Sequence, residues 1–243
     1  MSKIIFVHQG KTGGSTLAQV LRESYGPYFV FRDRDEKLRK EFNVFKRYYH
    51  QTYDRYLNPF RDRADKKVIY GHLEVEKYKR AFPDAFYMTF YRDPVQQIIS
   101  LYDYWKRTPV KFPKRISKAR RALQEKNLDF LDFVKFVLSH EDSYFYNVQP
   151  EQFQFTGLTE EYSKSLSILK KKYLPELKIP KEQMALNTNP DKSTDQSYQH
   201  PEMAELKQLL ANEISIYHRA KSKFESDYDS ISRLRLNHHR GKQ

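Results

Sequence analysis

The stretch KIIFVHQGKTGGSTLAQVL, residues 3–21, decides the fold that we expect for this chain. A short apolar run from Ile4 to Val7 predicts a buried strand, and a helical pattern begins at Ser15. The turn between them is rich in glycine and contains Lys11. Glycine lets backbone N–H groups converge on an anion, a helix N-terminus adds partial positive charge, and lysine adds a full charge. The stretch therefore predicts a phosphate-binding loop between a strand and a helix. The candidate binding residues are Gly10, Lys11, Thr12, Gly13, Gly14, Ser15 and Thr16.

The spacing within this loop argues against a nucleoside triphosphate site. The triplet Gly10-Lys11-Thr12 is typical of the NTPase phosphate loop, but that motif also needs a glycine five residues before Gly10. Ile5 stands there, inside the predicted strand. No acidic cluster of the metal-ligand type accompanies the loop, so we expect no obligatory metal.

A second motif lies in AFYMTFYRDPVQQIISLYDYW, residues 85–105. An aromatic strand is followed by Arg92, and Asp93 and Pro94 mark the start of a helix as its N-cap and first residue. Ser100 lies seven residues after Asp93, nearly two helical turns, so its hydroxyl returns to the same side of the helix. A guanidinium at a strand end can bind phosphate through two parallel N–H groups. Arg92 and Ser100 are therefore candidates for a second phosphate site.

Both motifs resemble those of sulfotransferases that use 3′-phosphoadenosine-5′-phosphosulfate (PAPS). Residues 8–15, HQGKTGGS, are similar to the H-x-P-K-T-G-G-[ST] loop of the branch that includes the glycan 2-O-sulfotransferases, with Gly10 at the place of the proline. Arg92 and Ser100 match a 3′-phosphate site written L-R-[DN]-P, with a serine eight residues after the arginine. Residues 156–169 resemble the G-[LV]-T-E segment of the same family.

The resemblance implies a fold, a reaction and a co-substrate. The fold is a single α/β domain with a mostly parallel sheet flanked by helices, the P-loop-kinase-like sulfotransferase fold, here over residues 1–225. The reaction is transfer of a sulfuryl group from PAPS to an acceptor hydroxyl on a carbohydrate or small molecule, with an acidic glycan among the candidate acceptors. Adenosine 3′,5′-bisphosphate (PAP) is the expected product, and no metal is expected. Transfer should be in-line and loose, so Lys11 is expected to stabilise charge on the bridging oxygen.

A histidine is the expected general base for an alcohol acceptor. His72 follows a predicted strand at residues 68–70, in a G-H pair that resembles the family, and its ordinary pKa near 6.5 suits proton abstraction. The glycan 2-O-sulfotransferases resemble H-G-H at this place, whereas this chain has Tyr70-Gly71-His72. His8, at the mouth of the loop, is the alternative base. Either histidine could instead make a structural hydrogen bond.

Composition indicates an anionic partner. The 243 residues suit one domain, and the net charge of +13 favours a nucleotide, an acidic glycan, a nucleic acid or a membrane surface. Two other functions stay open, a P-loop-like nucleotide kinase and a non-catalytic polyanion or RNA binder. The second explains the charge but not the spacing of Lys11, Arg92 and Ser100, so nucleic acid is not the expected partner. Without cysteine there is no disulfide or thiolate site.

The remaining pattern is one of alternating strands and helices, as in an α/β sheet. The apolar runs are too short to span a membrane and no signal peptide precedes the first strand, so we expect a cytoplasmic enzyme. The basic run at residues 106–126 is a mobile lid, a glycan-binding surface or an exposed helix face. Residues 226–243 form a basic, polar tail that we expect to fray. The other expected elements are a strand at 28–31, helices at 35–58, 128–138, 159–172 and from residue 201, and a polar loop at 187–201.

Overall fold

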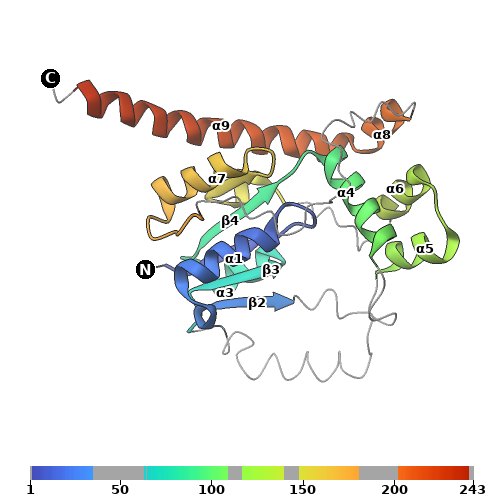
Figure 1. The fold of residues 1–243 in the computed structure, drawn as a ribbon, viewed down its shortest axis with the longest axis horizontal. Helices are drawn as coiled ribbons and strands as arrows, with labels where there is room; N and C mark the ends of the chain where they lie inside the picture. Colours follow the sequence, from blue (N-terminus) through green and yellow to red (C-terminus); the bar gives the residue numbers. More distant parts are fainter. Residues whose placement is uncertain are drawn as a thin grey trace.

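The computed structural model describes residues 2–34, 63, 65–108, 117–139, 148–180 and 202–240 (Figure 1). The expected helix at 35–58 and the polar loop at 187–201 lie outside the described residues. The strands are β1 (Ile4–Val7), β2 (Val30–Arg34), β3 (Val68–His72), β4 (Phe86–Tyr91) and β5 (Phe155–Leu158). The α-helices are α1 (Gly14–Tyr25), α3 (Val75–Ala81), α4 (Pro94–Arg107), α5 (Lys118–Lys126), α6 (Phe130–Ser139), α7 (Tyr162–Ile168), α8 (Met203–Leu209) and α9 (Ala211–Arg240).

The five strands form one parallel sheet in the order β2-β3-β1-β4-β5. The central strands β1, β3 and β4 are almost wholly buried, because helices cover both faces of a parallel sheet. This confirms the predicted α/β architecture. Since all strands run the same way, the loops that follow them meet at one edge of the sheet.

Helices α1 and α3 cover opposite faces of the sheet. Arg22 of α1 donates to the hydroxyl of Tyr70, whereas Tyr78 of α3 donates to Asp33. Tyr70 pairs in register with Arg32, the neighbour of Asp33, and adjacent residues of a strand point to opposite faces. In Figure 1, α1 lies in front of the sheet and α9 runs along its β5 side.

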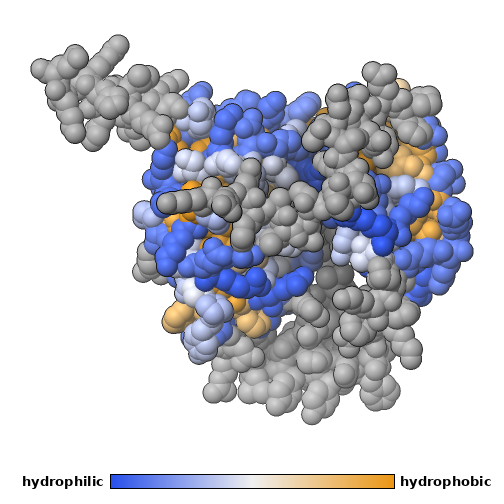
Figure 2. Space-filling model, viewed as in Figure 1, coloured by the Kyte–Doolittle hydropathy of each residue, from blue (hydrophilic) through white to orange (hydrophobic). Residues whose placement is uncertain are grey.

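The buried residues fall into two clusters. The larger cluster joins the sheet to α1, α3, α7 and α9. The smaller one joins α4, α5, α6 and α8, around the fully buried Phe133 and the nearly buried Trp105. Polar residues cover much of the described surface in view, with smaller apolar areas between them (Figure 2). None of the described helices is both long and apolar enough to cross a bilayer.

The structure corrects the bounds of three predicted elements and shows what part of the basic run forms. The strand expected at 28–31 begins at Val30, because Pro27 starts a 3₁₀ turn, Pro27–Phe29. The helix expected from residue 201 is two helices, α8 and α9, which meet at Leu210. The helix expected at 159–172 is α7, Tyr162–Ile168, which continues as a π-helical turn, Leu169–Tyr173. In the basic run, residues 118–126 form α5, whose Ala119, Ala122 and Leu123 are buried.

The expected frayed tail is also wrong, since α9 continues to Arg240. Phe224 is buried in the main core, and Ile231 packs against that core. Between them, the nearly buried Asp227 accepts from Lys172 at 2.6 Å and from Tyr173 at 3.0 Å. These contacts recur every three or four residues, so one face of α9 stays on the domain well past residue 226.

Candidate functional site

The loop after β1 ends in a helix N-terminus that has no side-chain cap. Gly13, the N-cap residue of α1, has a φ of 75°, in the left-handed region that favours glycine. Its carbonyl accepts from the N–H groups of Thr16 and Leu17. Among the described residues, the N–H groups of Gly14 and Ser15 have no acceptor. Two free N–H groups on the positive end of a twelve-residue helix are chemically suited to bind an anion.

Buried side chains hold this loop against β4 and α4. Gln97 of α4 donates to the carbonyl of Gly10 at 2.7 Å, and Gln9 donates to the carbonyl of Phe90 at 3.2 Å. The Thr12 hydroxyl is also buried and donates to the carbonyl of Gln9 at 2.9 Å. The hydroxyl of Thr12 thus braces the turn from inside, whereas Ser15 is exposed and Thr16 is half-buried at the start of α1.

Lys11 has an unusual backbone and a depressed pKa. Its φ of 62° is in the left-handed region, which costs a residue with a Cβ about 1–2 kcal/mol. Its ammonium lies 4.2 Å from the centre of the Tyr104 ring. Burial lowers the pKa of Lys11 to about 8, and the charges of Arg92 and Arg107 add to this effect. The lysine therefore stays largely protonated at neutral pH.

Arg92 follows β4 and reaches the loop directly. Its Nη1 donates to the carbonyl of Lys11 at 3.2 Å. Burial lowers the pKa of Arg92, an effect that Glu160 and Asp93 oppose, and an arginine so placed stays charged. The prediction that Asp93 caps α4 is confirmed, since its carboxylate accepts from the N–H of Gln96 at 3.0 Å.

Ser100 lies on the face of α4 that contacts the loop. It stands three residues after Gln97 and four before Tyr104, and both of these touch the loop. Residues at this spacing share one side of a helix. The structure thus places Ser100 on the same side as the two loop contacts, two turns from Arg92.

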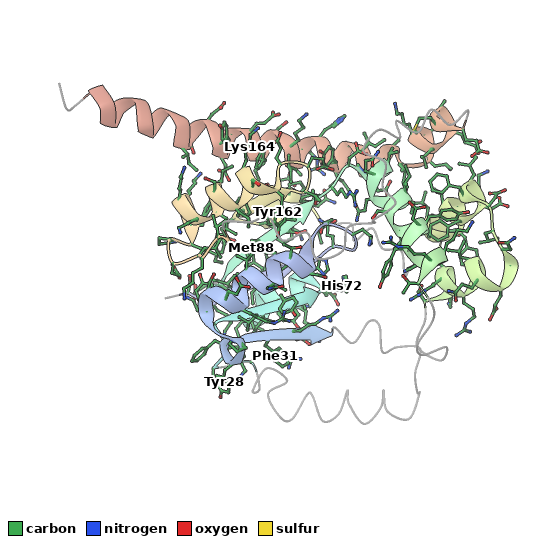
Figure 3. All side chains as sticks on the ribbon, in the orientation of Figure 1. Tyr28, Phe31, His72, Met88, Tyr162 and Lys164 are labelled. Carbon is green, nitrogen blue, oxygen red and sulfur yellow. The ribbon has the colours of Figure 1, made fainter. Side chains whose placement is uncertain are left out.

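The two histidines form a stacked pair at the same edge of the sheet. Their rings are 4.9 Å apart, with an angle of 22° between the planes. Nδ1 of His72 lies 2.7 Å from the carbonyl oxygen of His8. A carbonyl only accepts, so Nδ1 carries the proton and Nε2 keeps the lone pair in the neutral ring. In Figure 3, His72 lies at the end of β3, beside the loop that follows β1.

Both rings are held in the neutral form. Burial lowers the pKa of His8 to about 3, and His72, Arg32 and Lys11 add to this effect. Burial also lowers the pKa of His72, although its bond to His8 opposes the shift. The His8 ring lies against α1, because a Cβ added to Gly14 would be 2.0 Å from its Cδ2.

The site lies where the connections between strands change from one side of the sheet to the other. From β1 the chain passes through α1 to β2 on one side, and from β4 it passes through α4 to β5 on the other. Because β1 and β4 are neighbours, the segments that follow them diverge at the edge of the sheet, which is the usual ligand position in a parallel α/β sheet. Lys11 lies in the segment after β1, and Arg92 directly follows β4.

Sequence reasoning found the charged groups of this site and missed the polar ones behind them. Gln9, Gln97, Tyr104 and Glu160 were not predicted, although Glu160 accepts from the N–H of Asp93 at 2.8 Å. The sequence did contain a signal for Gln97: it is a polar residue beside Ile98 in a helix whose apolar face is buried, and such a residue needs a hydrogen-bond partner. Within the described ranges, no group of three His, Asp or Glu side chains is arranged to hold a metal ion.

Comparisons with known proteins give similarity at the level of structure only. No protein-family model matches the chain, and no curated protein is detectably similar to it in sequence. One similar structure is the crystal structure of mouse sulfotransferase SULT7A1 complexed with PAP. Its sequence identity to this chain is 16%, the TM-score is 0.39, and the match covers 85% of this chain. This chain spans 62% of that mouse protein. Another is the crystal structure of a sulfotransferase from Alicyclobacillus acidocaldarius, with 14% sequence identity and a TM-score of 0.41. That match covers 93% of this chain and 99% of the bacterial chain.

Proposed function

We propose that this protein is a sulfotransferase that moves the sulfuryl group of PAPS to an acceptor hydroxyl. One observation carries the proposal: Arg92, which follows β4, donates to the carbonyl of Lys11, so a guanidinium lies beside the loop that leads to the free N–H groups of α1. PAPS carries two separate anionic groups, a 5′-phosphosulfate and a 3′-phosphate. A nucleotide with phosphates at both ends of its ribose fits these two groups, and the resemblance of both motifs to PAPS-dependent enzymes selects this nucleotide.

The 5′-phosphosulfate is assigned to the loop and the start of α1. The free N–H groups of Gly14 and Ser15 support this assignment, since they leave the positive end of α1 open to an anion. The hydroxyls of Ser15 and Thr16 are accessible there, whereas Thr12 contributes through its backbone alone. Arg92 and Ser100 are assigned to the 3′-phosphate.

Transfer forms a bond between the acceptor oxygen and sulfur and breaks the bond from sulfur to the bridging oxygen. The leaving group is PAP, whose 5′-phosphate takes the bond's electron pair. Lys11, with its ammonium, stabilises the charge that develops on the bridging oxygen. The acceptor's proton passes to Nε2 of His72, the nitrogen that keeps a lone pair while Nδ1 bonds His8.

We assign the base to His72 rather than to His8. Burial lowers the pKa of both rings, and together with its cationic neighbours it lowers the pKa of His8 to about 3. A base so weakly basic gains little driving force for proton abstraction near neutrality. His8 instead holds His72 through its carbonyl and its ring.

The acceptor is proposed to be a hydroxyl of a carbohydrate or a small molecule. The resemblance to the glycan 2-O-sulfotransferase branch favours a carbohydrate, and the net charge of +13 suits an acidic glycan. No observation at the site favours nucleoside triphosphate chemistry or nucleic acid.

The test is a binding cycle between the 3′-phosphate and Arg92. Titration calorimetry compares PAP with adenosine 5′-phosphate, for the native protein and for Arg92→Ala. We expect the native protein to prefer PAP, and Arg92→Ala to lose most of that preference, with a coupling of about 1.5–3 kcal/mol. Arg121→Ala removes an exposed arginine of α5 and should change neither affinity. Equal binding of PAP and adenosine 5′-phosphate, or tighter binding of ATP with magnesium, would contradict the proposal.

A further inference from the structure

One face of α4 contacts the phosphate loop at two points. Gln97 bonds the carbonyl of Gly10, and two turns later the Tyr104 ring meets the ammonium of Lys11. Tyr104 is partly exposed and lies between the buried Leu101 and Trp105. The Tyr104 side chain packs against the buried cluster of α4, α5, α6 and α8, which holds this end of α4 in place. The ring is therefore presented to Lys11 from a fixed helix.

The surroundings of Lys11 disfavour the protonated form of its side chain. Burial, Arg92 after β4, and Arg107 on α4 all lower its pKa, whereas Asp103 on α4 raises it. His8, on the loop side, is held neutral and offers no compensating charge. The face of an aromatic ring carries negative electrostatic potential and attracts a cation within about 6 Å of its centre. The Tyr104 ring meets this condition at 4.2 Å.

We propose that Tyr104 is a positioning residue for the sulfuryl transfer proposed above: its ring fixes the direction of the Lys11 side chain and stabilises its charged form. The proposal rests on the proposed function for its catalytic meaning. The backbone of Lys11 is fixed separately, by its bond from Arg92. Loss of the ring should therefore free the ammonium and leave the loop that binds the nucleotide in place.

The experiment compares Tyr104→Leu and Tyr104→Gln, which remove the ring, with Tyr104→Phe, which keeps it. Leucine retains apolar bulk, so the burial of Lys11 changes little. Tyr102→Leu is the matched control, because Tyr102 lies on the same helix but packs on Phe130 and Phe133.

The first readout is the pH dependence of acetic anhydride labelling of Lys11 in the nucleotide-free protein, followed by mass spectrometry. We expect a midpoint near 8 in the native protein, Tyr104→Phe and Tyr102→Leu. In Tyr104→Leu and Tyr104→Gln, the midpoint should fall by about 0.5–1 unit, since the ring no longer favours the charged form. An unchanged midpoint in a folded variant without the ring overturns the proposal. This readout needs no sulfotransferase activity.

The second readout separates turnover from binding. Single-turnover release of PAP from PAPS should be about tenfold slower in Tyr104→Leu, and PAP affinity should stay within twofold of the native value. Tyr104→Phe should restore the rate. A loss of PAP affinity equal to the loss of rate would make Tyr104 a structural residue and overturn its positioning role. If the native protein does not bind PAP, the proposed function fails, while the labelling result still decides whether Tyr104 holds Lys11.

Discussion

At the scale of single residues, one hydrogen bond determines how the histidine pair can act. The carbonyl oxygen of His8 accepts a hydrogen bond from Nδ1 of His72 at 2.7 Å, which leaves Nε2 as the acceptor of the neutral ring. Stacking on His8 holds the imidazole in this orientation. In the proposed mechanism the two histidines therefore have different roles, His72 as the base and His8 as its support.

The rate of sulfuryl transfer should depend on pH with two limbs. Neutral His72 is the active form, so the rate rises with pH through its pKa, which burial holds below the ordinary 6.5. Protonated Lys11 is also required, so the rate falls as pH rises through about 8, the pKa to which burial lowers this lysine. The measurement is kcat/KM against pH, with labelled PAPS and an acceptor selected from a panel of carbohydrates and small alcohols.

His72→Ala should remove the acidic limb and slow transfer about a hundredfold or more, with PAP binding unchanged. His8→Ala should slow it less, because the backbone carbonyl of residue 8 remains. If His8→Ala were inactive and His72→Ala active, His8 would be the base and the present assignment would be wrong.

Gly13→Ala should damage the anion site. The φ of 75° at Gly13 strains any side chain, and the new Cβ would lie 3.3 Å from the Tyr162 ring. We expect a loss of about 1–2 kcal/mol in unfolding free energy, and weaker PAP binding because the N–H groups of α1 shift. Gly26→Ala is the control: its φ of 86° carries similar strain, but its Cβ would make ordinary contact with Phe29, away from the loop. Equal PAP affinities in the two variants would refute this reading.

At the scale of secondary-structure elements, α4 carries most of the side chains that contact the loop, and α9 packs along the β5 side of the sheet. Helix α4 begins beside Arg92 and carries Gln97, Ser100 and Tyr104 on its loop-facing side. Its opposite side packs on α5 and α6, which fixes its position. Helix α9 runs past β5, α7 and α4. The Tyr217 hydroxyl of α9 donates to Glu160 at 3.3 Å, so this helix supports the residue that holds Asp93.

The contact of α9 with the π-helical turn after α7 should contribute to stability. Asp227→Ala removes the partner of Lys172 and Tyr173 at a nearly buried position. We expect the free energy of unfolding in urea to fall by about 1–3 kcal/mol. Asp229→Ala removes an exposed carboxylate two residues further on and should change it by less than about 0.5 kcal/mol. A neutral Asp227→Ala would mean that the end of α9 does not stabilise the domain.

At the scale of the whole molecule, the proposed nucleotide site lies between elements of the two buried clusters. The loop after β1 follows a strand of the larger cluster, whereas α4 contributes to the smaller cluster with α5, α6 and α8. A ligand that contacts both the start of α1 and the start of α4 links them. Binding should therefore stabilise the domain as one unit.

PAP at a hundred times its dissociation constant should raise the melting temperature. The expected stabilisation is about 2.7 kcal/mol, which corresponds to roughly 5–10 °C for a domain of this size. ATP with magnesium should give a small shift or none, because it lacks the 3′-phosphate that Arg92 is proposed to hold. The measurement is differential scanning calorimetry at matched ligand saturation. A shift confined to one of two separate transitions would mean that the two clusters unfold independently.

Local patterns were enough to predict much of this protein. The strand, glycine turn and helix of residues 3–21, and the Asp93–Pro94 helix start, follow from short-range chemistry: apolar runs, caps and residues that permit particular backbone angles. The charged groups of the site, Lys11 and Arg92, were visible because loops after parallel strands collect at one edge of a sheet.

Only the tertiary structure decided how these groups act. The strand order, the proton on His72 Nδ1, the Gln97 brace and the Tyr104 contact all depend on residues far apart in sequence, which local propensity does not register. The continuation of α9 past residue 226 has the same cause: partners on α7 and the turn after it stabilise a segment whose own sequence reads as a polar tail. The sequence by itself determined which charged residues follow β1 and β4. The tertiary structure determined the protonation and the orientation of these side chains, because burial and long-range contacts control both.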